Sequence, residues 1–168
     1  MQEGVIGLGI WCIDTTYKIN ILPERGKLET IIDSYQCVGG GPSNVLTNLS
    51  SLGFKSNLIA MGSMGKDSNS VFIKKHCQRN KIISKYLSSS SLIPTSHVVC
   101  MSEKQKERTF LYYPGANKLL DIKHFKLSSL KKDPKILYFG YLSLLGKLDY
   151  FDGKETRLCK VLKEARKK

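Results

Sequence analysis

The sequence lacks closely spaced cysteines. Zinc sites and redox dithiols need thiols that lie close together in sequence, whereas the cysteines of this chain are scattered singly. We therefore expect reduced, structural thiols and no metal site. The cysteines are Cys12, Cys37, Cys77, Cys100 and Cys159.

Long apolar runs are also absent. The run from Val5 to Ile13 is too short to span a bilayer, no basic segment precedes it, and Asp14 closes it. The sequence thus predicts neither a signal peptide nor a membrane span, and we expect a soluble cytoplasmic protein. With 168 residues, of which 41% are apolar, the chain is long enough for one compact domain.

Acidic residues are scarce, since 14 Asp and Glu stand against 27 Lys and Arg, and the formal net charge is +13. A basic surface attracts phosphate, so a basic nucleic-acid-binding protein is one alternative. However, the lysines are spread along the whole chain, and no run combines arginine with aromatic residues in the manner of a base-reading surface. We therefore expect a lysine-rich solvated surface and no nucleic-acid partner.

Short β-branched segments predict strands near the N-terminus. Residues 5–10 have the pattern of a buried strand, and Asp14 follows just past its carboxyl end, the edge where open α/β sheets bind ligands. A turn-capping role is the structural alternative for this carboxylate. Two pairs of apolar stretches, at about 17–37 and 96–113, predict a small sheet set apart from the core.

The rest of the chain has the alternating pattern of an α/β protein. Helical spacing of leucines follows the glycines at 39–41, and strands and helices then succeed one another. We expect helices that begin at Pro42 or Ser43, at Asp67 or Ser68, and at Asp121, strands over 56–61 and 135–140, and a flexible loop over 88–91.

The final segment predicts an amphipathic helix. Asp152 and Glu155 have capping-box spacing, and one apolar stripe follows them. Because such a helix normally leads into the next strand of a parallel sheet, we expect an interrupted domain; a dimer or a shortened sheet would supply the same partner surface. The stripe consists of Leu158, Val161, Leu162 and Ala165.

Of three glycine motifs, two fail a chemical test. Residues 7–9 lack the third glycine of a dinucleotide fingerprint, and residues 62–66 lack the first glycine and the magnesium-binding Ser or Thr of a phosphate loop. Gly39 to Asn44 differs, because its glycines let backbone amides approach a ligand and Asn44 offers a donor and acceptors to hydroxyl groups. This chemistry suits a polyol, and a tight strand-to-helix turn is the structural alternative.

The order of these features resembles the N-terminal signature region of the PfkB, or ribokinase-like, family of carbohydrate kinases. It consists of a strand, Asp14, a strand pair, GGGPSN at 39–44 with its helix, and MGSMGKDS at 61–68. YYPGAN at 112–117 is similar to the return from the family's lid strands, and ILYFGYLS at 136–143 to the core strand that follows. The resemblance implies a ribokinase-like three-layer α/β sandwich with a small β-sheet lid, truncated after its N-terminal half.

The resemblance also implies a function, that of an ATP-dependent sugar kinase that uses Mg²⁺. Asp14 would bind sugar hydroxyls as a charged acceptor, while Gly40, Gly41 and Asn44 would complete the floor of the pocket. The lid strands would cover the sugar and could also form a homodimer. The loop is closest to that of fructokinase-like members.

The resemblance places no catalytic residue in this chain. The family's catalytic base is an Asp in an Asp-Thr-x-Gly-Ala-Gly-Asp segment, and residues 1–168 contain neither this segment nor the family's Asn-x-x-Glu motif. We therefore expect residues 1–168 to be the N-terminal part of one domain whose catalytic half is absent, and to be inactive alone. The alternative function is a catalytically inactive module that binds a sugar or nucleoside.

Overall fold

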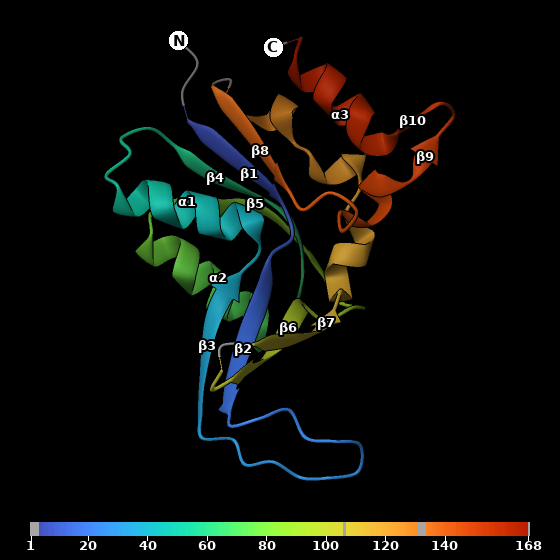
Figure 1. The fold of residues 1–168 in the computed structure, drawn as a ribbon. Coiled ribbons are helices and arrows are strands. Elements are labelled where there is room, and N and C mark those ends of the chain that lie inside the picture. Colours follow the sequence, from blue (N-terminus) through green and yellow to red (C-terminus); the bar gives the residue numbers. More distant parts are fainter. Residues whose placement is uncertain (1–3, 106, 131–133, 168) are drawn as a thin grey trace.

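The computed structural model describes residues 4–105, 107–130 and 134–167. Its main sheet has the strand order β5-β4-β1-β8, and every neighbouring pair is parallel (Figure 1). The carboxyl ends of these strands therefore gather at one edge of the sheet. The strands are β1 (Val5–Gly9), β4 (Leu58–Gly65), β5 (Ile82–Ser90) and β8 (Ile136–Gly140).

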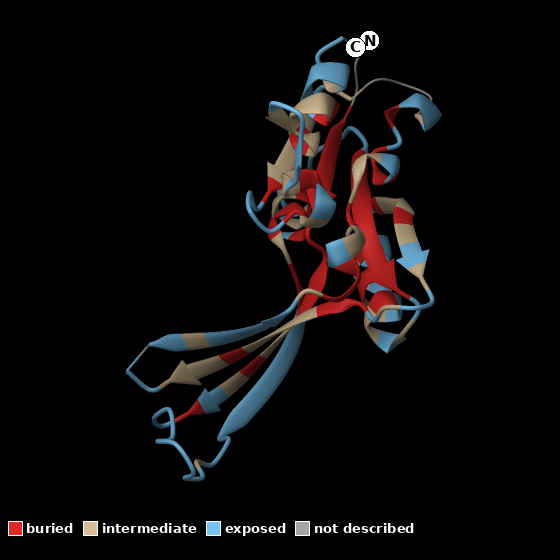
Figure 2. Cartoon of the chain, turned by 90° about the vertical axis from the view of Figure 1, so that its right-hand side faces the viewer, coloured by how far each residue is buried: buried red, intermediate tan, exposed pale blue. Residues whose placement is uncertain are grey.

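A second sheet, with the order β3-β2-β6-β7, extends away from the main body (Figure 2). Strands β2 and β6 are parallel, and the two outer pairings are antiparallel. The small separate sheet that the sequence predicts is thus present, and we refer to it below as the lid sheet. Its strands are β2 (Cys12–Ile19), β3 (Asp33–Gly39), β6 (Ser96–Glu103) and β7 (Arg108–Tyr113).

The chain passes from the main sheet into the lid sheet without a turn. Only Ile10 and Trp11 separate the end of β1 from the start of β2. Trp11 is fully buried, and its indole Nε1 donates a hydrogen bond to the carbonyl oxygen of Met61 at 3.1 Å. This anchor holds the crossing point against β4, so β2 starts earlier than the predicted lid strand and includes Asp14.

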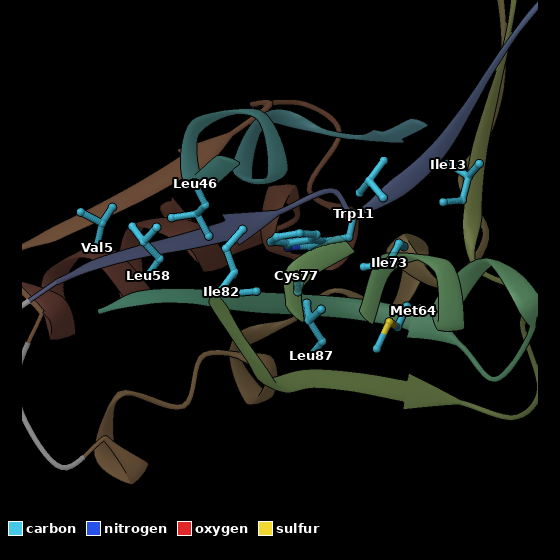
Figure 3. Close-up of a cluster of buried hydrophobic side chains, with 12 residues drawn as sticks. Val5, Trp11, Ile13, Leu46, Leu58, Met64, Ile73, Cys77, Ile82 and Leu87 are labelled. Atoms are coloured by element: carbon cyan, nitrogen blue, oxygen red, sulfur yellow. The ribbon is translucent and has the colours of Figure 1, made fainter. Parts of the chain in front are cut away.

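Two helices cover one face of the main sheet, α1 (Gly41–Ser51) and α2 (Ser68–Arg79). Their apolar residues, such as Leu46 and Ile73, pack with side chains of the sheet in one buried cluster (Figure 3). Helix α2 begins where the sequence predicts, because the Asp67 carboxylate accepts the backbone N–H of Ser70 at 2.9 Å in a capping box.

The other face carries a series of 3₁₀ turns and the final helix, α3 (Arg157–Ala165). Leu158 and Val161 of α3 are buried with Ile6 and Leu8 of β1, which is worth roughly 1.5–3 kcal/mol for each large side chain. With a helical layer on each face, the three-layer α/β prediction is confirmed. The turns are η1 (Gly115–Leu119), η2 (Ile122–His124), η3 (Leu127–Ser129) and η4 (Gly146–Asp149).

Three local predictions were wrong. The helix expected from Asp121 is instead the pair of short turns η2 and η3. The loop expected over 88–91 is largely strand, because β5 continues to Ser90 and pairs with β4, so that backbone pairing outweighs the weak strand propensity of serine. The capping box expected from Asp152 and Glu155 does not form at α3. The helix is capped instead by Thr156, whose hydroxyl accepts a backbone N–H of the first turn.

The residues expected to cap α3 lie instead in a small hairpin. Asp152 belongs to β9 (Phe151–Asp152) and Glu155 to β10 (Glu155–Thr156), and each carboxylate pairs with a lysine of α3. These ion pairs hold the hairpin against the helix surface. Within the part of the chain that is described, no helix has the length and apolar content needed to cross a membrane.

Candidate functional site

A glycine loop joins lid strand β3 to helix α1. Gly39 ends β3, Gly40 is the N-cap with a φ of 95°, and Gly41 is the first residue of α1. A side chain on Gly40 would overlap the carbonyl oxygen of Ile10, so both its backbone conformation and this close approach require glycine. The loop therefore lies directly on the chain that crosses from β1 to β2.

The carboxylate of Asp14 lies at the start of this loop. Asp14 is in β2, opposite Cys37 of β3 and beside Val98 of β6. Its half-buried carboxylate fills the space next to Gly39, where even a methyl group would overlap both carboxylate oxygens. Because Asp14 lies inside a strand, it caps no turn. The structure thus brings the carboxylate and the glycine loop together.

Asn44 lies one turn further along, in the first turn of α1. Its backbone N–H donates to the carbonyl oxygen of Gly40 at 3.1 Å, which closes that turn. The residue is exposed, whereas Gly41 is buried and Gly40 half-buried. The four predicted site residues therefore come from two neighbouring elements, β2 and the junction between the loop and α1.

Burial sets the electrostatics of this site. It raises the pKa of Asp14 above its ordinary value of 3.8, although a hydrogen bond from Cys12, with 3.3 Å between Sγ and Oδ1, acts in the opposite direction. Burial and then the charge of Asp14 also raise the pKa of the Cys12 and Cys37 thiols. Both thiols therefore stay protonated at neutral pH and place no second negative charge beside Asp14. The Asp14 carboxylate can then act as the acceptor for hydroxyl groups.

Tyr138 is a residue at this site that sequence reasoning missed. It lies in the middle of β8, and its hydroxyl comes close to the glycine loop, because a Cβ added to Gly41 would lie 2.8 Å from the hydroxyl oxygen. A tyrosine in a strand pattern that reads as buried was the available signal, since a buried hydroxyl needs a polar neighbour. Tyr138 therefore limits the space above Gly41.

Asn117 and Asp149 were also missed. Both line a cavity of about 320 Å³ beyond the carboxyl end of β8. Asp149 accepts the backbone N–H groups of Ser143 and Leu145 at 3.2 and 2.6 Å. Asn117 donates to the carbonyl oxygen of Trp11 at 3.4 Å, and its buried Oδ1 has no partner among the described residues. The end of YYPGAN was a signal for Asn117, whereas no motif marked Asp149.

The described residues contain no preformed cluster of ligands for the Mg²⁺ that the resemblance implies. Within the ranges that the structure covers, no group of three or more His, Cys, Asp or Glu is placed to hold a metal ion. Mg²⁺ is usually held by carboxylates together with phosphate oxygens, and the Asp149 carboxylate is engaged by backbone amides. A Mg²⁺ site here would need further ligands, such as phosphate oxygens.

Several solved structures share this fold. Ribokinase from Giardia lamblia matches with a TM-score of 0.80 and 18% identity over 99% of this chain and 51% of its own. Fructokinase from Xylella fastidiosa matches with a TM-score of 0.65 and 23% identity, over 82% of this chain and 42% of its own. Arabidopsis thaliana ribokinase, complexed with ribose and ATP, matches with a TM-score of 0.60 and 20% identity, over 70% of this chain and 38% of its own. The chain thus spans about half the length of these relatives or less.

A comparison of the sequence with family models agrees with the fold. The model of the pfkB family carbohydrate kinases matches residues 6–164, nearly the whole chain. The comparison with curated proteins gave no match. The parallel sheet flanked by helices is the ribokinase-like fold that the sequence predicts. The chain belongs to the pfkB family of carbohydrate kinases.

Proposed function

We propose that this chain forms the N-terminal, sugar-binding part of one ribokinase-like domain of a carbohydrate kinase. Asp14, Gly40, Gly41 and Asn44 are the proposed sugar-binding residues. The observation that carries the proposal is the half-buried Asp14 carboxylate lying against Gly39, at the start of a loop without side chains. Membership of the pfkB family supports a sugar as the ligand.

The chemistry of these groups suits a polyhydroxylated ligand. A carboxylate accepts hydrogen bonds from two hydroxyl groups at once, and each bond to a charged acceptor is worth about 1.5–3 kcal/mol. The exposed amide of Asn44 can donate to one hydroxyl and accept from another. The absence of side chains at Gly40 and Gly41 lets the sugar ring approach the backbone closely.

The lid sheet would exclude water from the bound sugar. Asp14 itself lies on β2, so the lid carries part of the proposed pocket. The lid strands project from the main body, and most of their residues outside the base are exposed or half-buried (Figure 2). Closing this sheet over the sugar would remove water, which competes with the sugar as a phosphoryl acceptor.

For the whole protein, we propose transfer of the γ-phosphate of ATP to a sugar hydroxyl. ATP and Mg²⁺ would supply the phosphoryl group and its charge neutralisation. This chain would contribute the fixed orientation of the sugar, because Asp14 and Asn44 hold hydroxyl groups at set positions. Orientation of this kind accounts for much of the rate enhancement in enzymes that join two substrates.

Titration calorimetry of the full chain tests the binding proposal. Fructose, ribose and adenosine are titrated separately, and we expect heat with at least one of them. The same titrations are repeated with Asp14→Asn and with a matched control, Asp33→Asn, which removes an exposed carboxylate paired with Lys18 on the same sheet. Absence of heat with all three compounds, or equal affinities for the two variants, would contradict the proposal.

A catalytically inactive binding module is the second candidate, because residues 1–168 lack the catalytic Asp segment that the family resemblance implies. The described residues also include no group of three or more His, Cys, Asp or Glu placed to hold a metal ion. Release of ADP from ATP and Mg²⁺ in the presence of the bound sugar separates the two candidates. Sugar binding without ADP release supports the module. Release of ADP that is lost in Asp14→Asn supports a kinase.

The lid sheet also supports our proposal of a homodimer. Edge strand β7 carries apolar side chains that are more than half exposed, Phe110 at 57% and Leu111 at 58%. Exposed apolar residues on an edge strand are available for pairing with a second copy. Sedimentation equilibrium of the chain checks this, and we expect Phe110→Lys/Leu111→Lys to shift a dimer to the monomer; a wild-type monomer at all concentrations would contradict it.

A further inference from the structure

A second polar cavity lies on the opposite face of the main sheet from α1 and α2. Its volume is about 340 Å³, and it is found where β4 and β5 end, under turns η1 and η2. It includes none of the proposed sugar-binding residues. Its lining consists of Ser63, Ser88, Ser89, Ser90, Leu119, Lys123, His124 and Lys126.

The strands place hydroxyl groups on the floor of this cavity. Ser63 follows Ile59 and Met61 in the two-residue alternation of β4, so its side chain points to the same face as those two core residues. Ser63 is only 2% exposed, and it lines the cavity. The hydroxyl of Ser88 donates to the carbonyl oxygen of Gly62 at 3.0 Å. Ser63 therefore places a hydroxyl in a buried position on the wall of the cavity.

His124 presents a second buried donor to the cavity. The residue is 6% exposed, and its Nδ1 lies 2.9 Å from the backbone nitrogen of Asp121 and 3.2 Å from the carbonyl oxygen of the same residue. In the neutral tautomer that accepts the shorter bond from the Asp121 N–H, the ring proton is on Nε2, which makes Nε2 a donor. Burial lowers the pKa of His124, and this outweighs the hydrogen bond to the Asp121 backbone and the Asp121 charge, which raise it. The positive charges of Lys123 and Lys126 also lower the pKa, so the neutral form prevails at neutral pH.

The mouth of the cavity is positively charged. Lys123 and Lys126 are exposed, and no carboxylate belongs to the lining. The neighbouring carboxylate of Asp121 is held by Arg157 at 2.7 Å and by the backbone N–H of Ile122 at 2.7 Å. Two buried donors and two cations without an opposing acid form a site for an anion, since oxyanions take several donors at once.

We propose that this cavity binds the phosphate group of a small metabolite, at a site separate from the proposed sugar site. Ser63 and His124 would donate to the phosphate oxygens, and Lys123 and Lys126 would neutralise its charge. A volume of about 340 Å³ lies within the range of small-molecule pockets, so a phosphate ester fits as well as free phosphate.

Binding of two probes to the full chain tests this site. Inorganic phosphate and glycerol 3-phosphate are titrated by calorimetry at constant ionic strength and without sugar. For Ser63→Ala, loss of a hydrogen bond to a charged group predicts roughly 10- to 150-fold weaker binding. For Lys123→Ala/Lys126→Ala, loss of two exposed charge pairs predicts roughly 2- to 30-fold weaker binding.

The matched control is Lys74→Ala/Lys75→Ala, which removes the same charge from the exposed face of α2. We expect it to leave the affinity for both probes unchanged. Tighter binding of glycerol 3-phosphate identifies an ester as the ligand, and equal affinities identify free phosphate. Lack of binding by either probe, or equal weakening in the control and the two site variants, would overturn the proposal. Asp14→Asn is expected to bind both probes normally, so this test is independent of sugar binding.

Discussion

Replacing Asp14 by asparagine is expected to stabilise the fold and weaken sugar binding. The side chain keeps its shape beside Gly39 and loses its charge. Burial raises the pKa of Asp14 in the folded chain above 3.8, although the Cys12 hydrogen bond opposes this. Between the ordinary pKa of the unfolded chain and the raised pKa of the folded chain, the folded chain therefore binds more protons than the unfolded chain. Stability therefore falls as pH rises through that window, and the buried charge destabilises the fold at neutral pH.

The effect on affinity follows from the lost charge. A hydrogen bond to a charged acceptor contributes about 1.5–3 kcal/mol. At 1.36 kcal/mol for each tenfold change, loss of one such bond corresponds to roughly 10- to 150-fold weaker sugar binding. Asparagine still accepts one hydrogen bond through its oxygen, so the lower part of this range is expected if the sugar donates a single hydroxyl.

Urea unfolding at several pH values and titration calorimetry together check this prediction. We expect Asp14→Asn to be more stable than the wild type at pH 7, with the difference disappearing as pH falls below about 3.8. Asp33→Asn, on the same lid sheet, is expected to leave sugar affinity unchanged. The reasoning is refuted if Asp14→Asn is less stable at pH 7 or binds sugar with wild-type affinity.

Three further predictions concern the scaffold. Asp67 accepts two hydrogen bonds from Thr95, both at 2.6 Å, and we expect Asp67→Ala to lower the free energy of unfolding by roughly 3 kcal/mol in urea melts. Partial burial raises the pKa of Asp67, but the hydrogen bonds, above all those from Thr95, outweigh burial and lower the pKa below 3.8. The stabilisation by Asp67 is therefore present above pH 3.8 and is lost as pH falls through the lowered pKa. Acid titration of wild type and variant tests this pH dependence. We expect Gly40→Ala to lower the free energy of unfolding by about 1–3 kcal/mol through backbone strain alone, as measured by thermal unfolding. An unchanged melting temperature would contradict the positive φ of Gly40. We expect Leu158→Ala, at a buried position, to lower the free energy of unfolding by about 2–5 kcal/mol. Leu162→Ala, at a 39% exposed position, is expected to lower it by less than about 0.5 kcal/mol. Equal decreases for the two variants would contradict the packing of α3.

Signals that act over a few residues predicted much of the fold. The start of α1 follows the glycine loop, and α2 begins after Asp67, because a carboxylate beside free backbone N–H groups caps a helix wherever it lies. The strands over 5–10 and 135–140 agree with β1 and β8, because short runs of β-branched, aromatic and other apolar residues fit the buried surface of a sheet. These elements form for local reasons.

Other elements depend on residues distant in sequence. The serines before Leu92 have weak strand propensity, but β4 offers their backbone hydrogen-bond partners as far as Gly65. Residues after Asp121 contain apolar side chains at mixed spacing, and packing against the sheet divides them into two short turns. No pattern within either segment reports which neighbour it meets.

The candidate site shows the same division. Sequence alone determined that a carboxylate, three glycines and an asparagine occur in the order typical of the pfkB family. Tertiary structure decided that the crossing at Trp11 sends β2 into the lid sheet, which places Asp14 inside a strand and beside Gly39. It also decided that Ser63 and His124, from unrelated segments, line one cavity. The physical reason is that residue type and local spacing set which backbone conformations are favourable, whereas contacts between distant segments depend on how the whole chain packs its apolar faces.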